Sequence, residues 1–273
     1  MLLAAIEHAA GSGFDAHAWQ LFWSLDNFLY RRGHWHDRVA AGRTGVAAAG
    51  RLTDPVGRQR THRLLGEAYT ELHRFDDAHV QLSHALAVAA QSSDHAGLGE
   101  THSSLAVLCG RQGDHRRAYD HACDAVDEFQ AAGDQAGEAW ALNQVGWQNT
   151  CSAKHEQALI SAHRALRLHR NLGDRVKEAA CWDTIGYAHH HLGHHSEAIT
   201  HYLNALTVYR DLSDQYGAAE VLKHLGDTHH STGDTYAAQD AWQQALTILD
   251  DLHHPDAAAI RTKLESDSSG CSA

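Results

Sequence analysis

Histidine and aspartate residues in the last third of the sequence have types that can bind a metal ion. His190 and His230 lie 40 residues apart. Asp183 precedes His190 by seven residues, so Asp183 and His190 share one face of a helix. Two imidazoles and a carboxylate can coordinate a transition metal such as zinc. The spacing matches no established motif such as HExxH. The sequence therefore predicts neither a metal site nor a cofactor.

The same segment carries groups that could move protons. Lys223 and Asp227 join Asp183, His190 and His230 in a potential acid–base cluster. The sequence contains no GxxxxGK[ST] phosphate-binding loop, and nothing in it fixes a nucleophile or a cofactor. We therefore expect no catalytic residues. The alternative that stays open is a cofactor-independent enzyme or a small-molecule-binding protein that uses these side chains.

The composition argues against nucleic acids and membranes as partners. The 22 Lys and Arg against 34 Asp and Glu give a formal net charge of −12, whereas a protein that binds phosphates needs a basic surface. No stretch approaches the roughly 18 apolar residues that span a bilayer, and the opening MLLAAIEHAAGSG lacks the basic region of a signal peptide. The five cysteines include no CxxC pair. We expect reduced thiols and a cytoplasmic protein.

A repeat of 40 residues must position these side chains, because it runs through most of the chain. One position of the period holds glycine or alanine, and two later positions hold alanine. The three sets are Gly66, Ala106, Gly146, Gly186 and Gly226; Ala78, Ala118, Ala158, Ala198 and Ala238; and Ala85, Ala125, Ala165, Ala205 and Ala245. The two alanine sets are seven residues apart and share one helical face. Small residues in this register predict paired helices whose backbones approach closely, stabilised by contacts between neighbouring units.

Turn residues recur between the predicted helices. Glycine stands at the end of the first helix in several units, where it suits a left-handed terminus, and Asp114 and Asp234 follow as expected N-caps of the second helix. The glycines are Gly33, Gly113, Gly193 and Gly233. The second connection contains Thr53-Asp54, Ser93-Asp94, Gly133-Asp134, Gly173-Asp174 and Ser213-Asp214. The sequence therefore predicts helix–turn–helix hairpins stacked side by side.

The repeat predicts one array over residues 1–265 and an all-α fold. We expect a right-handed α-solenoid of about six helix–turn–helix units with flanking helices. In the first unit, the positions that hold the recurring glycine or alanine residues in the other units are occupied by Asp26, Arg38 and Gly45. The predicted parts are a divergent segment 1–54 with a helix at about 2–10, five clear units in 55–254, a closing helix in 255–265, and a disordered tail in 266–273.

The pattern Leu65-Gly66, Ala78 and Ala85-Leu86 is similar to the tetratricopeptide repeat (TPR) consensus. The period of 40 exceeds the usual 34, and the proline that usually ends each unit is missing. This variety resembles the C-terminal TPR arrays of actinobacterial regulators of the SARP/AfsR type, above all in AWQLFWSLDNFLYRRGHW and ALTILDDLHHPDAAAIRTKL. The resemblance implies a sensor or interaction module of the kind often attached to NTPase and DNA-binding domains.

The resemblance also implies which side chains face a ligand, because the first helix of each TPR unit lines the concave groove. Aromatic and polar residues fall at these positions. The predicted ligand-binding residues are Trp23, Tyr30, Arg63, Trp140, Asn143, Trp147, Asp183, Tyr187, His190, Lys223, Asp227 and His230. Exposed tryptophans often anchor binding partners, and an amide such as Asn143 can hold a peptide backbone. The other interpretation is that the tryptophans pack against long side chains of adjacent helices.

The sequence thus predicts a protein- or peptide-binding TPR module. The resemblance implies the sensing or interaction part of a bacterial transcriptional regulator, or a free-standing relative. A small molecule stays open as a ligand, and direct contact with nucleic acid or membrane is not expected. The Lys, Asn and Arg set of the chaperone-type carboxylate clamp is not reproduced, so a chaperone's acidic C-terminus is disfavoured as the partner.

Overall fold

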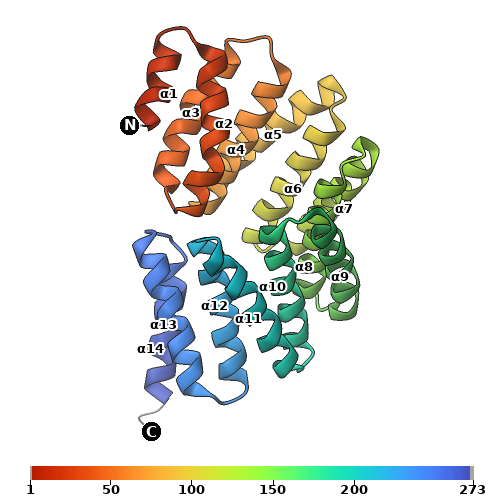
Figure 1. Ribbon diagram of the computed structural model, residues 1–273, viewed down its shortest axis with the longest axis vertical. Coiled ribbons are helices and arrows are strands. Elements are labelled where there is room, and N and C mark those ends of the chain that lie inside the picture. The colour runs from red at the N-terminus through yellow and green to blue at the C-terminus, as the bar shows by residue number, and fades with distance from the viewer. Residues whose placement is uncertain (1, 271–273) are drawn as a thin grey trace. The chain divides into compact units, whose positions relative to one another are not determined.

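The structure, a computed structural model, describes residues 2–270 and the side chains of residues 3–266. This part of the chain forms fourteen helices and no strand, so the all-α prediction is confirmed (Figure 1). The helices are α1 Leu2–Gly11, α2 Asp15–Arg31, α3 Trp35–Gly50, α4 Pro55–Glu71, α5 Phe75–Ser92, α6 His95–Arg111, α7 His115–Ala132, α8 Gln135–Cys151, α9 His155–Leu172, α10 Arg175–His191, α11 His195–Asp211, α12 Gln215–Ser231, α13 Thr235–Asp251 and α14 Ala257–Gly270.

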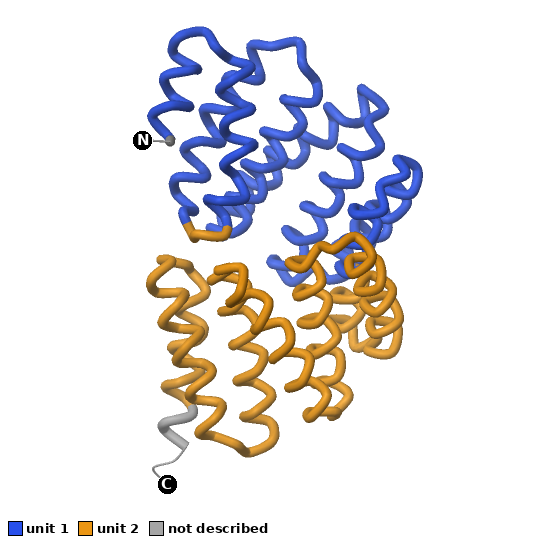
Figure 2. The backbone as a smooth tube through the Cα atoms, in the orientation of Figure 1, with its two compact units in different colours: residues 1–30, 34–144 blue, residues 31–33, 145–273 orange. Residues whose placement is uncertain are grey.

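The helices belong to two compact units (Figure 2). Unit 1 contains residues 1–30 and 34–144, and unit 2 contains residues 31–33 and 145–273. Within unit 1, α4 packs on α5 and α6 packs on α7, and α4 also contacts α6. Within unit 2, the pairs are α10 with α11 and α12 with α13, and α10 also contacts α12. Each unit is therefore built from helix hairpins stacked on one another. A single array over residues 1–265 stays a prediction.

The predicted turn chemistry is present at the helix ends. At the α6–α7 connection, Gly113 has a φ of +81°, and the side chain of Asp114 accepts a hydrogen bond of 3.0 Å from the backbone N–H of Arg117. Asp234 caps α13 in the same way. Gly33, Gly193 and Gly233 also have positive φ angles. The first helices begin at aspartate caps as well: Asp54, Asp94, Asp134, Asp174 and Asp214.

The recurring small residues lie where two helices cross. Ala78, Ala118, Ala158, Ala198 and Ala238 are completely buried. A Cβ atom on Gly146 would lie 3.1 Å from the carbonyl oxygen of Ala158 and 3.3 Å from the Cβ of Ala162. A Cβ atom on Gly186 would lie 2.7 Å from the ring of buried Tyr202. These contacts confirm that small residues permit the close approach of the helices.

The first hairpin, α2–α3, uses a different solution. Arg38 donates from Nε to Asp26 Oδ1 at 2.6 Å and from Nη2 to Oδ2 at 2.9 Å, and both residues are buried. Gly45, which takes the place of an alanine, lies against the ring of Phe22. An ion pair between α2 and α3 therefore occupies the positions that hold glycine and alanine in later hairpins.

A flanking helix packs in each unit, α1 against α3 in unit 1 and α14 against α13 in unit 2. The sequence predicted a helix at about residues 2–10, and the structure has α1 at Leu2–Gly11. α14 runs to Gly270, whereas the sequence predicted that the closing helix ends at residue 265 and a disordered tail begins at 266. The last residues of that tail, 271–273, lie outside the described part of the chain.

The structure was also searched for membrane-spanning helices and for disulfides. In the part of the chain that the structure describes, no helix combines the length and apolar character that crossing a membrane requires. Cys109, Cys123, Cys151 and Cys181 are free thiols; Cys271 lies outside the described residues.

Candidate functional site

The first helices of unit 2 bring several predicted ligand-binding residues into one aromatic cluster. Trp147 on α8 stacks on Tyr187 on α10, with ring centroids 4.8 Å apart and an interplanar angle of 20°. His224 on α12 lies 5.5 Å from the Trp147 ring and 4.9 Å from the Tyr187 ring. Its Nδ1 is 2.8 Å from Asp183 Oδ1. We call Trp147, Asp183, Tyr187 and His224 the Trp147–Tyr187 cluster.

The repeat explains why these rings meet. Trp147 and Tyr187 directly follow Gly146 and Gly186, so they occupy the same position of two consecutive first helices. The glycines let α8 and α10 pack closely against their second helices, which fixes the direction of the following side chain. Both rings are half-buried, so each keeps part of its surface for a partner. Burial raises the pKa of the Tyr187 hydroxyl to about 12.

His190 lies beside the cluster in a neutral form. Its Nδ1 is 2.9 Å from the Thr228 hydroxyl, and its ring lies 6.4 Å from that of Tyr187. Burial lowers the pKa of His190 to about 4, with further lowering by the neighbouring imidazoles of His191 and His195. His190 therefore offers hydrogen bonding without a positive charge at neutral pH.

Two ion pairs hold the remaining predicted residues of unit 2. Lys223 Nζ lies 2.8 Å from Glu220 on the preceding turn of α12. Asp227 accepts hydrogen bonds from Lys263 Nζ at 2.6 Å and from Trp242 Nε1 at 3.0 Å. These contacts neutralise the charges of Lys223 and Asp227 locally, while leaving both side chains half-buried.

The potential acid–base cluster is therefore divided among separate partners. Asp183 bonds to His224, Lys223 to Glu220 and Asp227 to Lys263, and His230 is exposed. Among residues 3–266, the group of three possible metal ligands that the structure brings together is not Asp183, His190 and His230. It is His102, His121 and Asp124 on α6 and α7.

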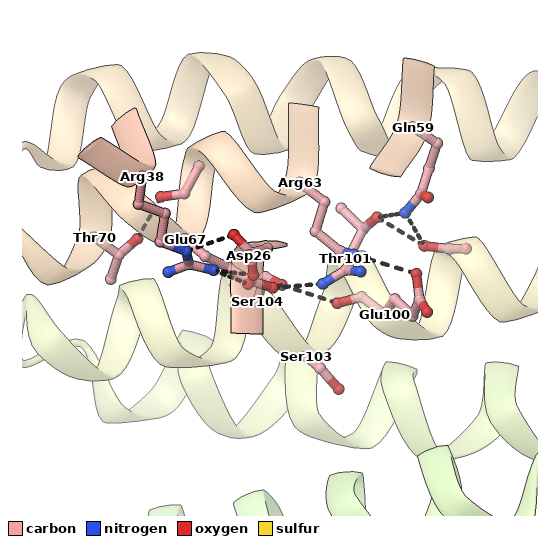
Figure 3. A network of polar contacts seen from close by, with 12 residues as sticks. Asp26, Arg38, Gln59, Arg63, Glu67, Thr70, Glu100, Thr101, Ser103 and Ser104 are labelled. Carbon is pink, nitrogen blue, oxygen red and sulfur yellow. Dashed lines mark hydrogen bonds and ion pairs between the residues drawn. The ribbon is translucent and has the colours of Figure 1, made fainter. Parts of the chain in front are cut away.

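In unit 1, Arg63 is part of a partly buried ion-pair network rather than an open binding residue (Figure 3). Its Nη1 lies 2.7 Å from Glu67, and its Nε lies 3.2 Å from Glu100. Glu67 also binds Arg38 at 3.0 Å and accepts a hydrogen bond of 2.6 Å from the Ser104 hydroxyl. The network thus joins α3, α4 and α6, and two carboxylates compensate the charge of Arg63.

Glu67 is the centre of this network. Burial raises the pKa of Glu67, but the positive charges of Arg63 and Arg38 outweigh burial and lower it to about 2. The carboxylate therefore stays ionised over the whole physiological range, and it contributes to the stability of unit 1.

Asn143 is buried, which differs from the open groove position that the sequence predicted. The residue is 4% exposed, and its Oδ1 has no hydrogen-bond partner among the described residues. The same holds for the hydroxyl of Ser103, one repeat earlier, and for Oε1 of Gln144. Gln144 Nε2 donates to the Ser103 carbonyl at 3.0 Å. Buried polar atoms are usually paired, so these three oxygens on α6 and α8 are exceptions, and because they are shielded from solvent they do not form part of an open binding surface.

The other predicted aromatic residues of unit 1 lie in other settings. Trp23 is exposed, and the Arg60 guanidinium lies 4.9 Å above its ring. Tyr30 packs edge-on against Trp35 at 5.4 Å, and Trp140 is half-buried. The structure thus supports both sequence interpretations, because some rings pack on neighbours and others present a face to solvent.

His224 was missing from the predicted set. The helical register predicted that Lys223 faces the groove. His224 follows Lys223 directly and was therefore not among the positions predicted to face the groove. The signal that could have found it is its separation of 41 residues from Asp183, which places the two side chains on neighbouring first helices.

Sequence comparison identifies the repeat. A tetratricopeptide repeat family model matches residues 58–131 and 178–251, which is more than half of the chain. The chain belongs to the tetratricopeptide repeat family. The TPR match includes the hairpins of both units. No curated protein matches the sequence.

Solved structures share the fold of this TPR chain at low identity. A Rap protein complexed with Competence and Sporulation Factor is 14% identical, with a TM-score of 0.68 over 92% of this chain and 76% of that chain. NprR in complex with its cognate peptide NprX is 12% identical, with a TM-score of 0.65 over 96% and 70%. PH0952 from Pyrococcus horikoshii, a signal transduction ATPase with a TPR sensor, is 14% identical, with a TM-score of 0.60 over 94% and 40%. At these identities the likeness shows the fold alone.

Proposed function

We propose that this chain is a protein- or peptide-binding TPR module and that the Trp147–Tyr187 cluster anchors the partner. The observation that carries the proposal is the stack of two half-buried rings on consecutive first helices, held by the Asp183–His224 pair. A rigid aromatic platform contributes a large contact area at a low cost in side-chain entropy. An apolar or aromatic side chain of a peptide would cover the exposed faces of these rings.

Polar groups next to the cluster suit the backbone of such a partner. Helix α12 carries three half-buried charged residues, Glu220, Lys223 and Asp227, each of which is paired with an opposite charge. Because their charges are compensated, these side chains can form hydrogen bonds to an uncharged ligand. Contacts to backbone groups tolerate variation in the partner's sequence.

The comparisons support this class of ligand. NprR is solved with a cognate peptide, and Rap with Competence and Sporulation Factor. We further propose that the module is the sensing part of a cytoplasmic regulator, or a free-standing relative, as the resemblance to SARP/AfsR-type arrays implies. PH0952 combines a TPR sensor with an ATPase, and the four described thiols are free, as in a reducing compartment.

The test is a selection from a random peptide library, followed by calorimetric titration of the selected peptides. Trp147→Ala is compared with Trp182→Ala, a matched control on α10. Trp182 is also half-buried. Its ring stacks on that of His201 of α11 at 5.0 Å, and the Arg170 guanidinium of α9 lies over it. Trp182 therefore belongs to a different surface. Circular dichroism melts verify that both variants are folded.

We expect Trp147→Ala to weaken binding by about 1–3 kcal/mol, which is roughly 5- to 150-fold, and Trp182→Ala to leave it within about twofold. Equal losses for the two variants, or none, would overturn the assignment of the cluster. If no peptide is selected while a small molecule binds and depends on Trp147, the small-molecule alternative replaces the peptide.

A further inference from the structure

The α6–α7 hairpin of unit 1 carries three potential metal ligands that the proposed function does not use. His102 lies on α6, and His121 and Asp124 lie one turn apart on α7. His102 Nδ1 is 3.1 Å from His121 Nδ1, and Asp124 Oδ2 is 3.5 Å and 3.8 Å from these two nitrogens. We propose that His102, His121 and Asp124 bind a divalent transition-metal ion, with zinc as the expected ion.

The distances between the ligand atoms fit one ion. Zinc bonds to imidazole nitrogen and carboxylate oxygen are about 2.0–2.1 Å long, so ligand atoms at the corners of a tetrahedron are about 3.3–3.4 Å apart. The three separations of 3.1, 3.5 and 3.8 Å lie around this value. Side-chain shifts of a few tenths of an ångström would therefore bring all three atoms into contact with the ion.

The proposed site has two mostly buried imidazole ligands and one solvent-exposed carboxylate ligand. The imidazole side chains of His102 and His121 are 16% and 21% exposed, whereas that of Asp124 is 56% exposed. The two helices hold the rings, and the carboxylate can rotate onto the ion. Three protein ligands leave the fourth position to water or to an external ligand, the arrangement of zinc sites that are not purely structural.

The surroundings favour a cation. Asp120 and Glu128 lie on the same helix as His121, and their carboxylates are close enough to His121 and His102, respectively, to interact with them electrostatically.

The repeat provides an internal comparison. The positions equivalent to His102, His121 and Asp124 hold different residues in the four hairpins α4–α5, α8–α9, α10–α11 and α12–α13. They are His62, Gln81 and His84; Leu142, Ser161 and Arg164; Trp182, His201 and Asn204; and Leu222, Ala241 and Gln244. In the α4–α5 hairpin, His62 Nδ1 pairs with the Gln81 amide oxygen at 2.8 Å. The three-ligand set is thus not a by-product of the repeat pattern.

The experiment uses the untagged full-length chain, freed of metal with a chelator and titrated with zinc alone. Because the chain has 26 histidines, it will also bind zinc weakly elsewhere, so variants must identify the site. His102→Ala and Asp124→Asn remove ligands, and His62→Ala is the matched control at the equivalent position of α4. Cobalt replaces zinc in a parallel titration, because its visible spectrum reports tetrahedral coordination.

We expect one equivalent of zinc to bind more tightly than the rest and to raise the melting temperature. His102→Ala and Asp124→Asn should weaken that equivalent at least tenfold and abolish the tetrahedral cobalt bands, while His62→Ala keeps both. Asp124 is exposed, so its variant should fold even if His102→Ala does not. Equal binding by all variants, or only weak binding of many equivalents, shows an adventitious ion only and overturns the proposal. Peptide affinity through Trp147 is a separate readout and is not expected to change.

Discussion

Arg38 and Asp26 form a buried, two-hydrogen-bond ion pair at positions that hold alanine and glycine in the later hairpins. Arg38 is 2% exposed and also reaches Glu67 on α4. Burial lowers the pKa of Arg38, but the charges of Asp26 and Glu67 outweigh burial and raise it. The first hairpin therefore closes, and connects to the next one, through charge rather than through small residues.

This relationship predicts strong coupling between the two substitutions. Asp26→Gly alone leaves a buried guanidinium with one partner fewer, and we expect it to cost about 3–5 kcal/mol of the free energy of unfolding. Asp26→Gly combined with Arg38→Ala recreates the residue pair of the later hairpins, so the double variant should be more stable than the sum of the single effects implies. Urea unfolding of the four proteins measures the coupling. Additive losses would show that the pair does not replace the small-residue contact.

A second prediction concerns the small residues of unit 2. Ala158 is fully buried, and its carbonyl oxygen lies close to Gly146. Ala158→Leu should overpack the contact between α8 and α9 and cost about 1–3 kcal/mol. Gln157→Leu, at an exposed neighbouring position on α9, should stay within about 0.5 kcal/mol of the wild type. A thermal melt of Ala158→Leu that matches the wild type would refute the role of close helix approach.

A third prediction follows from the low pKa of Glu67. The folded-state pKa of about 2 lies below the usual value of 4.5, so the charged carboxylate stabilises the fold above pH 4.5. That contribution is lost as the pH falls from about 4.5 to 2 and amounts to up to about 3 kcal/mol. Glu67→Gln should lower stability at pH 7 and flatten the acid limb of the stability curve. Urea unfolding at several pH values between 2 and 7 tests this; an unchanged slope would contradict it.

Histidine protonation should destabilise unit 2 at a milder pH. Burial, together with His189 and His163, lowers the pKa of His201 to about 4 from 6.5. The unfolded chain therefore binds the proton first, and stability is lost as the pH falls from about 6.5 to 4. We expect His201→Gln to reduce the loss between pH 7 and 5 by about 1 kcal/mol, less than the full shift because the imidazole is partly solvated. His8→Gln, on an exposed face of α1, is the control that should leave the pH dependence intact.

The fold followed from the sequence because its signals are local and repeated. Gly113 adopts positive φ and Asp114 caps the next helix as expected, since these roles depend only on nearby backbone. The buried Ala158 was predictable in the same way, because its register fixes the face that it occupies. Fourteen helices in the described chain and hairpin stacking within each unit thus required no knowledge of distant contacts.

The candidate sites were predictable only in part, because they depend on partners in other helices. The helical register placed Trp147 and Tyr187 on equivalent positions, but it did not predict their stacking on each other or their contacts with His224. Asn143 was expected to be open, yet the neighbouring helices bury it. The proximity of His102 and His121 arises from packing between α6 and α7, and a separation of 19 residues carries no familiar metal motif.

Contact between a bound peptide and Trp147 can be observed directly by ¹⁹F NMR. Biosynthetic labelling with fluorotryptophan gives one ¹⁹F signal for each of the seven tryptophans, and Trp147→Ala and Trp182→Ala assign two of them. On saturation with a selected peptide, we predict that the Trp147 signal shifts while the Trp182 signal stays in place. A saturated complex in which the Trp147 signal does not move would show that the peptide does not bind at the Trp147–Tyr187 cluster.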